Sequence, residues 1–290
     1  MNPYELHPER LATTDEHGNR IYLHPEDVHG KWRDRRRIVY TGLILLYILL
    51  PWFEVNGHQS ILINLPQRYF VFFGFEFFGH DTPYLFFLII GFAFLMAFAT
   101  SILGRVWCGW VCPQTVFIDI VFRPIERLIE GNAKKQRELD SQPLSLKKVI
   151  LKSLKWTIFI FVSLIISHSF LGYFLGTHNL FQIITHSPLE HWESFIVMLV
   201  ATTITAVDFG WFREQFCIIM CPYGRFQSVI MDSDSLVVAY DEKRGEPRRD
   251  KTIPKESQGD CINCYHCVRV CPTGICIRRG AQLECIACTM

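Results

Sequence analysis

Six cysteines near the C-terminus have the spacing of iron–sulfur ligands. Residues 261–272 follow the pattern C-x2-C-x2-C-x3-C-P, and a C-x2-C pair follows at Cys285 and Cys288. Three thiolates at steps of three residues can hold one corner of a cubane cluster, and the cysteine before proline ligates a different cluster in two-cluster proteins. Zinc knuckles and disulfide frameworks rarely combine this spacing with a terminal Cys-Pro. We therefore predict iron–sulfur binding by the first run, which consists of Cys261, Cys264, Cys267 and Cys271.

A second pattern, C-x3-C-P, occurs twice, with Cys108 and Cys112 in one copy and Cys217 and Cys221 in the other. Cysteines at positions i and i+4 lie on one face of a helix. The proline after each pair removes a backbone donor, and it should displace a carbonyl (Gly109 in the first copy) from the helical ladder. We expect each helix to kink or restart at the Cys-Pro step.

The elements that carry these cysteines are apolar enough for a membrane. Half of the 290 residues are hydrophobic and 20% are charged, a mixture that suits several spans joined to a soluble module. Buried helices of a soluble protein are the alternative for any one apolar stretch, but four stretches in one chain make it improbable. We predict four transmembrane helices in two repeated two-span units, with apolar stretches at Ile38–Phe53, Tyr84–Leu103, Trp156–Leu175 and Phe195–Phe212.

The distribution of Lys and Arg predicts the orientation of these spans. Lys and Arg are abundant before the first span, between the second and third, and after the fourth, whereas the other two loops carry only Arg68. Under the positive-inside rule both ends of the chain are cytoplasmic. The cysteine-rich C-terminal segment should then lie in the cytoplasm, where thiols stay reduced. The net charge of +1 gives no indication of a nucleic-acid partner.

This orientation places both C-x3-C-P pairs at the cytoplasmic ends of their spans. Four thiols could therefore converge at one depth. Such a site suits Cu(I), an iron–sulfur cluster or a redox-active dithiol, and it excludes Mg²⁺ and Ca²⁺. The alternative is that the four cysteines pack as small apolar side chains. Two copies with matching topology favour the metal or redox interpretation.

The domain organisation follows from the same patterns. We predict a cytoplasmic arm at 1–36 with no cleavable signal peptide, a membrane domain at 37–230, a linker at 231–259 and a truncated ferredoxin-type α+β domain at 260–290. The fold class is therefore a mainly α membrane protein with a small α+β module.

Other polar and aromatic residues receive structural interpretations. We expect the histidines of the arm, such as His24, and the carboxylates Asp119 and Glu126 to face solvent. Asp208 should pair with Arg213 or Arg105, and the aromatic segment 65–78 should lie in the outer membrane interface. His168, within the third span, and the histidines of the outer loops are given no metal-binding role, because no two lie at i, i+3 or i, i+4.

The combined motifs resemble the cytochrome c oxidase accessory protein family, known as CcoG, FixG or RdxA. The resemblance covers nearly the whole chain from residue 20. It is carried by the stretches 30–33 (GKWR), 107–114 (WCGWVCPQ), 122–127 (FRPIER), 221–227 (CPYGRFQ) and 240–248 (YDEKRGEPR). The C-x3-C-P motif alone is shared with quinol-oxidising membrane ferredoxins of the NapH and NosR type, so the combination and order of the motifs are more specific.

The resemblance implies a protein of the bacterial inner membrane that carries two [4Fe-4S] clusters and helps to assemble a cbb-type cytochrome c oxidase. The activity it implies is reduction of Cu(II) to Cu(I) with electrons from an unidentified donor. Thiolates stabilise Cu(I), and low-potential clusters can supply the electron. We assign copper binding and reduction to Cys108, Cys112, Cys217 and Cys221.

The chain departs from the family in its second ferredoxin motif, which stops in mid-pattern at Met290. By the interleaved arrangement, cluster 1 would use Cys261, Cys264 and Cys267, and cluster 2 would use Cys271, Cys285 and Cys288. Each cluster then lacks one protein ligand, and we expect a truncated chain. Cys276 is interpreted as a spare thiol. Two further functions stay open: a NapH- or NosR-like electron conduit from quinol to another acceptor, and a non-enzymatic copper or redox sensor.

Overall fold

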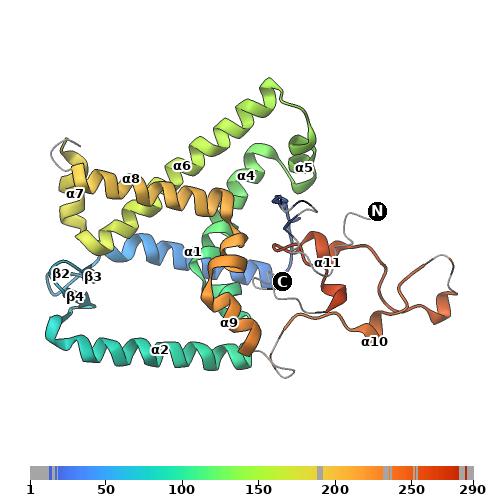
Figure 1. The fold of residues 1–290 in the computed structure, drawn as a ribbon, viewed down its shortest axis with the longest axis horizontal. Helices are drawn as coiled ribbons and strands as arrows, with labels where there is room; N and C mark the ends of the chain where they lie inside the picture. The colour runs from blue at the N-terminus through green and yellow to red at the C-terminus, as the bar shows by residue number, and fades with distance from the viewer. Residues whose placement is uncertain are drawn as a thin grey trace.

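Long helices form one elongated body, with a small β-structure at one end and the cysteine-rich segment at the other (Figure 1). The computed structural model describes residues 13, 14, 17, 19–187, 192–230, 235, 237–250, 252, 254–280 and 285. The long helices are α1 (Lys31–Leu49), α2 (Thr82–Leu103), α6 (Leu146–Leu175) and α8 (Trp192–Val207). The shorter helices include α4 (Arg123–Glu130), α5 (Ala133–Ser141), α7 (Thr177–Thr185) and α10 (Glu242–Gly245).

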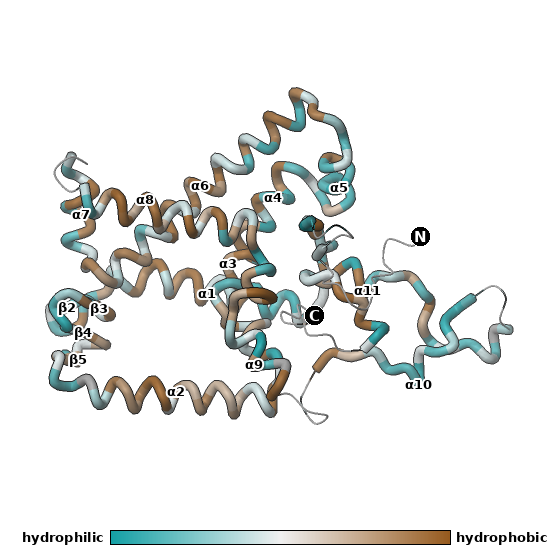
Figure 2. Tube along the Cα trace, viewed as in Figure 1, coloured by the Kyte–Doolittle hydropathy of each residue, from teal (hydrophilic) through white to brown (hydrophobic). Residues whose placement is uncertain are grey.

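Three helical segments are long and apolar enough to cross a membrane: Pro83–Leu103, Leu146–Leu175 and Trp192–Phe212. They coincide with three of the expected spans, and Figure 2 shows them as largely hydrophobic. Helix α1 begins inside the basic cluster, and its apolar part from Ile38 to Leu49 covers only about 18 Å at 1.5 Å per residue. A fourth span and the two-span repeat therefore remain predictions.

The end of the body near α7 carries a β-structure that the sequence analysis did not anticipate. The strands are β1 (Glu54–Val55), β2 (His58–Gln59), β3 (Ile61–Asn64), β4 (Tyr69–Phe72) and β5 (Phe75–Phe77). β1 and β2 form one antiparallel pair, and β3–β4–β5 form a second antiparallel sheet. The segment 65–78 forms two of these strands, β4 and β5, with their turns, and its position in the outer membrane interface stays a prediction.

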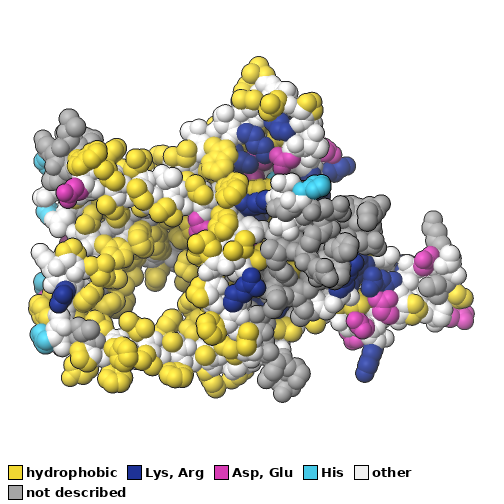
Figure 3. All heavy atoms as spheres, viewed as in Figure 1, with side chains coloured by type: hydrophobic (Ala, Val, Ile, Leu, Met, Phe, Trp, Pro, Cys, Tyr) yellow, Lys and Arg dark blue, Asp and Glu magenta, His cyan; other side chains and the backbone are white. Residues whose placement is uncertain are grey.

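The opposite end of the body is held by buried ion pairs. Glu126 on α4 lies 3.1 Å from Lys155 on α6 and 3.0 Å from Arg213, which follows the π turn after α8. Asp119 bonds Arg33 of α1 and lies 3.3 Å from Arg123. Asp119 and Glu126 are only 3% and 2% exposed, so the expectation that they face solvent is wrong. Figure 3 shows Lys and Arg side chains gathered at this end, while apolar side chains cover the long helices.

The N-terminal arm is part of the folded structure. His24 is buried and lies 2.7 Å from Asp140 of α5, and the Tyr22 hydroxyl donates to the carbonyl of Gly210 at 2.9 Å. Glu26 pairs at 3.1 Å with Arg269 of the cysteine-rich segment. Leu23 also lies against Gly274, where an added Cβ would come within 2.7 Å of it. The expectation of a solvated His24 is therefore wrong, because the arm packs between two parts of the protein.

The ion pairs of Glu126 predict a large effect of one substitution. Glu126→Gln keeps the shape of the side chain but leaves the buried charge of Arg213 without its carboxylate partner, whereas Lys155 keeps Glu130 at 2.8 Å. Removing one partner of a buried pair costs about 3–5 kcal/mol. We expect a clear fall in the thermal midpoint of the detergent-solubilised protein. Glu138→Gln is the matched control, because its pair with Lys134 is exposed and should contribute no more than about 1 kcal/mol. Equal midpoints for the two variants would contradict this assignment.

Candidate metal centre

The two C-x3-C-P segments fold in the same way. Each forms a π turn, η3 (Trp107–Val111) and η6 (Phe216–Met220), and each then restarts as a helix at the proline, in α3 (Pro113–Phe117) and α9 (Pro222–Ile230). The amide of Cys112 donates to the carbonyl of Trp107 at 2.9 Å, and Cys221 makes the same bond to Phe216. Proline is tolerated at the first position of a helix because it needs no amide donor there. The predicted restart at the Cys-Pro step is confirmed.

A buried tyrosine satisfies a backbone group in the first copy. The hydroxyl of Tyr40 on α1 donates a hydrogen bond to the carbonyl of Gly109, which the sequence analysis expected to leave the helical ladder. Tyr40 is completely buried. An unpaired buried carbonyl costs free energy, so this bond stabilises the fold. It also joins α1 to the π turn of the first cysteine pair.

The structure brings the two pairs together. Cys108 and Cys217, which are 5% and 7% exposed, belong to one buried cluster with Ile218, and Trp107 and Tyr223 pack against it. Cys112 and Cys221 are half-buried. Burial raises the pKa of Cys108 and of Cys217, and each of these thiols also interacts electrostatically with Cys221. Cys108 and Cys217 therefore lie together although they come from separate helical segments, and Cys221 lies near enough to both to affect their pKa.

The donor set of this site fits a thiolate-bound metal. Soft sulfur ligands in an apolar cluster suit copper or an iron–sulfur cluster. Among the described residues, no group of three His, Cys, Asp or Glu side chains is arranged to hold a single metal ion. A buried amide beside Cys108, that of Gln227, carries a donor nitrogen without a hydrogen-bond partner in the described part of the chain. This nitrogen could donate a hydrogen bond to an acceptor that binds beside Cys108.

Polar residues around the thiols have partners that the sequence did not predict. Asp208 accepts a hydrogen bond at 3.0 Å from Gln114, which follows the first Cys-Pro step. The sequence analysis expected a pair with Arg213 or Arg105, but the partner found among the described residues is Gln114. Arg213 instead pairs with Glu126. Gln114 also donates to the carbonyl of Arg213 at 3.3 Å, so it links the first copy to the segment that precedes the second.

The cysteine-rich segment contains one short helix, α11 (His266–Arg269), and a 3-10 turn, η8 (Ile277–Arg279). Residues 260–280 contain no strand, so the expected β-structure of a ferredoxin-type domain is not found in this described part. Asn263 and Tyr265 have positive φ angles of 55° and 58°, which curve the loop that carries the first three cysteines. The Arg278 guanidinium lies 3.7 Å from the Tyr265 ring centroid and donates to Asn263 at 2.7 Å.

The predicted cluster ligands differ in their exposure to solvent. Cys261, Cys267 and Cys271 are half-buried, Cys264 is exposed, and Cys276 is buried. The guanidinium of Arg105, three residues before Cys108, donates to the sulfur of Cys285. This contact joins a predicted ligand of cluster 2 to the segment that carries the first C-x3-C-P pair. Cys288 lies outside the described residues.

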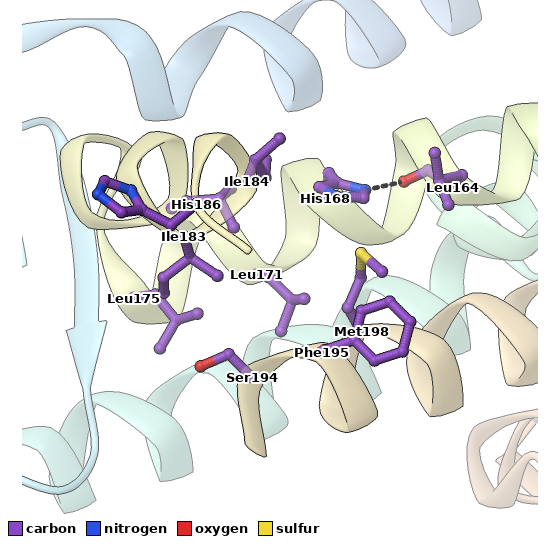
Figure 4. Close-up of a pocket in the computed structure, with 11 residues that line it drawn as sticks. Leu164, His168, Leu171, Leu175, Ile183, Ile184, His186, Ser194, Phe195 and Met198 are labelled. Carbon is purple, nitrogen blue, oxygen red and sulfur yellow. Dashed lines mark hydrogen bonds between the residues drawn. The ribbon is translucent and has the colours of Figure 1, made fainter. Parts of the chain in front are cut away.

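A separate cavity of about 270 Å³ lies between α6, α7 and α8, near the end of the body that carries the β-structure (Figure 4). Among the described residues its lining is mainly apolar and includes two histidines, His168 and His186. The Nδ1 atom of His168 lies 2.7 Å from the carbonyl of Leu164, so its other ring nitrogen is the group left for a ligand. The two histidines are 18 positions apart, and no local spacing rule would have paired them. The described lining residues include no cysteine.

Comparisons with known proteins agree with an iron–sulfur assignment. Residues 212–290 match a family model described as a 4Fe-4S dicluster domain, and residues 84–132 match one described as a 4Fe-4S binding domain. Protein RdxA of Cereibacter sphaeroides is 35% identical over 93% of this chain and 58% of its own length. The nitrogen fixation protein FixG of Rhizobium meliloti is 34% identical over 92% of this chain and 52% of its own length. The chain belongs to the FixG/RdxA family.

This FixG/RdxA chain spans little more than half the length of those two relatives. The ferredoxin-type protein MauN, from the methylamine utilization system of Methylobacillus flagellatus, is 24% identical over 83% of the chain and 76% of its own length. No solved structure matches. The apolar helices and the 4Fe-4S family models together indicate a membrane iron–sulfur protein.

Burial predicts different reactivity within each cysteine pair. When metal-free protein in detergent is treated with a maleimide and mapped by mass spectrometry, Cys112 and Cys221 should be modified first. Cys108 and Cys217 should react only after unfolding, because their sulfur atoms lie inside the apolar cluster. Equal rates at all four positions would contradict the arrangement.

Proposed function

We propose that this chain is a membrane-bound electron-transfer protein that reduces Cu(II) to Cu(I) at its four C-x3-C-P cysteines. The observation that carries the proposal is the meeting of Cys108 and Cys217 in one buried cluster, although they lie on separate helices. Sulfur ligands stabilise Cu(I) over Cu(II), so a site of this kind favours the reduced product.

The position of the cysteine-rich segment supports an electron supply to this site. Arg105 contacts Cys285 on that segment and lies three residues before Cys108. Clusters ligated by the ferredoxin-type cysteines would supply electrons one at a time, as reduction of Cu(II) requires. The predicted ligands are Cys261, Cys264 and Cys267 for one cluster and Cys271, Cys285 and Cys288 for the other.

The roles of the protein groups follow from their surroundings. Cys108 and Cys217 lie in the apolar interior, where water is excluded, and the half-buried Cys112 and Cys221 offer the approach to copper. The ion pairs of Glu126 and Asp119 hold the segments that carry both pairs. Delivery of the Cu(I) product to the assembly machinery of a cbb-type oxidase is the physiological role we propose for the family member as a whole.

Cysteine variants test the copper assignment. The reconstituted protein, reduced chemically and freed of excess reductant, should convert Cu(II) to Cu(I), as measured with a Cu(I)-specific chelator. Cys108→Ser and Cys217→Ser should each lower the rate at least tenfold, because a hydroxyl is a poor ligand for Cu(I). Cys276→Ala is the control, since Cys276 lies outside the three cysteine patterns. Unchanged copper reduction in the Cys108 and Cys217 variants would refute the assignment of these residues.

A second candidate function has a specific observation in its favour. The family model described as 4Fe-4S binding covers residues 84–132, and the cysteines of that stretch are Cys108 and Cys112. The four C-x3-C-P thiols would then hold an iron–sulfur cluster, and the protein would pass electrons from quinol to another acceptor, as in a NapH-like conduit.

Iron content distinguishes the two candidates. The full chain with all six C-terminal pattern cysteines changed to serine retains only the C-x3-C-P pairs and Cys276. If these pairs bind copper, this variant should contain no iron or acid-labile sulfide after anaerobic reconstitution, and it should bind Cu(I). About four iron atoms per chain would instead establish the second candidate.

A further inference from the structure

Gln227 is a buried amide placed among the candidate metal ligands. It lies on α9, the helix that restarts after Cys221, and its side chain is 1% exposed. The thiol of Cys108 donates to Oε1 of Gln227 at 3.1 Å. Its Nε2 is buried and has no hydrogen-bond partner in the described part of the chain.

This arrangement is costly unless the amide has another use. A buried donor without an acceptor costs about 1–3 kcal/mol. An apolar side chain of similar shape, such as methionine, would fill the same space without that cost. Neighbouring polar groups are already engaged: Gln114 donates to Asp208, and the hydroxyls of Thr100 and Tyr223 lie 2.6 Å apart. The unpaired nitrogen of Gln227 is explained if an acceptor becomes available when the site binds its ligand.

We propose that Gln227 is a positioning residue that donates a hydrogen bond from Nε2 to the sulfur of a metal-bound cysteine in the C-x3-C-P site. A thiolate that binds a metal carries no hydrogen and has lone pairs to accept one. The Gln227 amide has an acceptor for the thiol of Cys108 and a donor for a thiolate, so it can serve both forms. This inference rests on the proposed function, because it requires that the four thiols bind a metal.

The hydrogen bond has two chemical consequences. It fixes the orientation of the ligand, as outer partners of metal ligands do, and their removal typically lowers metal affinity 10- to 100-fold. It also withdraws electron density from sulfur, which stabilises the more reduced metal. Reduction potentials of sulfur-ligated centres depend on such hydrogen bonds. Gln227 would therefore favour the Cu(I) form.

The test is Gln227→Leu, which keeps a side chain of similar volume, removes both polar atoms and adds no sulfur ligand for Cu(I). Cu(I) affinity is measured on the full chain by competition with a chelator, and the potential of bound copper by redox titration. We expect at least a tenfold loss of Cu(I) affinity and a lower potential, by about 59 mV for each tenfold loss confined to Cu(I). Gln136→Leu is the matched control, because Gln136 is also buried but bonds the carbonyl of Gly131, on the α4–α5 connection.

The outcomes separate this inference from the proposed function. If the wild-type protein binds no copper at the C-x3-C-P cysteines, the proposed function fails. If the wild type binds copper and Gln227→Leu binds it with the same affinity and potential, Gln227 is only a packing residue and the inference is overturned. Should Gln227→Leu not fold, Gln227→Ala gives the same comparison. A loss of affinity equal to that of Gln136→Leu would also overturn the inference, since it would reflect general destabilisation.

Discussion

The buried ion pairs of Glu126 constrain the arrangement of the part of the body that carries the two cysteine pairs. A carboxylate taken out of water is tolerated only with close partners, and Glu126 finds them on α6 and in the turn before η6. Asp119 does the same for α1 through Arg33. Because Arg213 directly precedes the second cysteine segment and Asp119 follows the first, these ion pairs also fix the positions of the two cysteine segments.

The sequence predicted what depends on local spacing. Three apolar runs became helices of spanning length, and both Cys-Pro steps became helix restarts. These features follow from hydropathy and from the missing amide of proline, which act over a few residues. The meeting of Cys108 with Cys217 was also anticipated, because two matching motifs at the same end of their spans place their thiols at a similar depth.

Long-range pairing could not be derived in the same way. Asp119 and Glu126 were expected to face solvent, yet both are buried with partners from distant parts of the chain. Gln227 ends the stretch 221–227 that carries the family resemblance, but no local spacing predicts its partner, because it bonds a cysteine 119 residues away. The strands β1 to β5 were missed for a different reason. Asn56-Gly57, with φ angles of 56° and 82°, is a typical hairpin turn. The sequence analysis instead interpreted the stretch that follows from its aromatic content.

The docking of the N-terminal arm has a consequence for biosynthesis. Glu26 and Arg269 are separated by 243 residues, and Leu23 rests on Gly274. The arm leaves the ribosome before the cysteine-rich segment that it contacts. Closing so long a loop costs little more than closing a shorter one, because the entropy grows only logarithmically with length. The contacts of the arm with the cysteine-rich segment can therefore form only after all the helices between them have been synthesised.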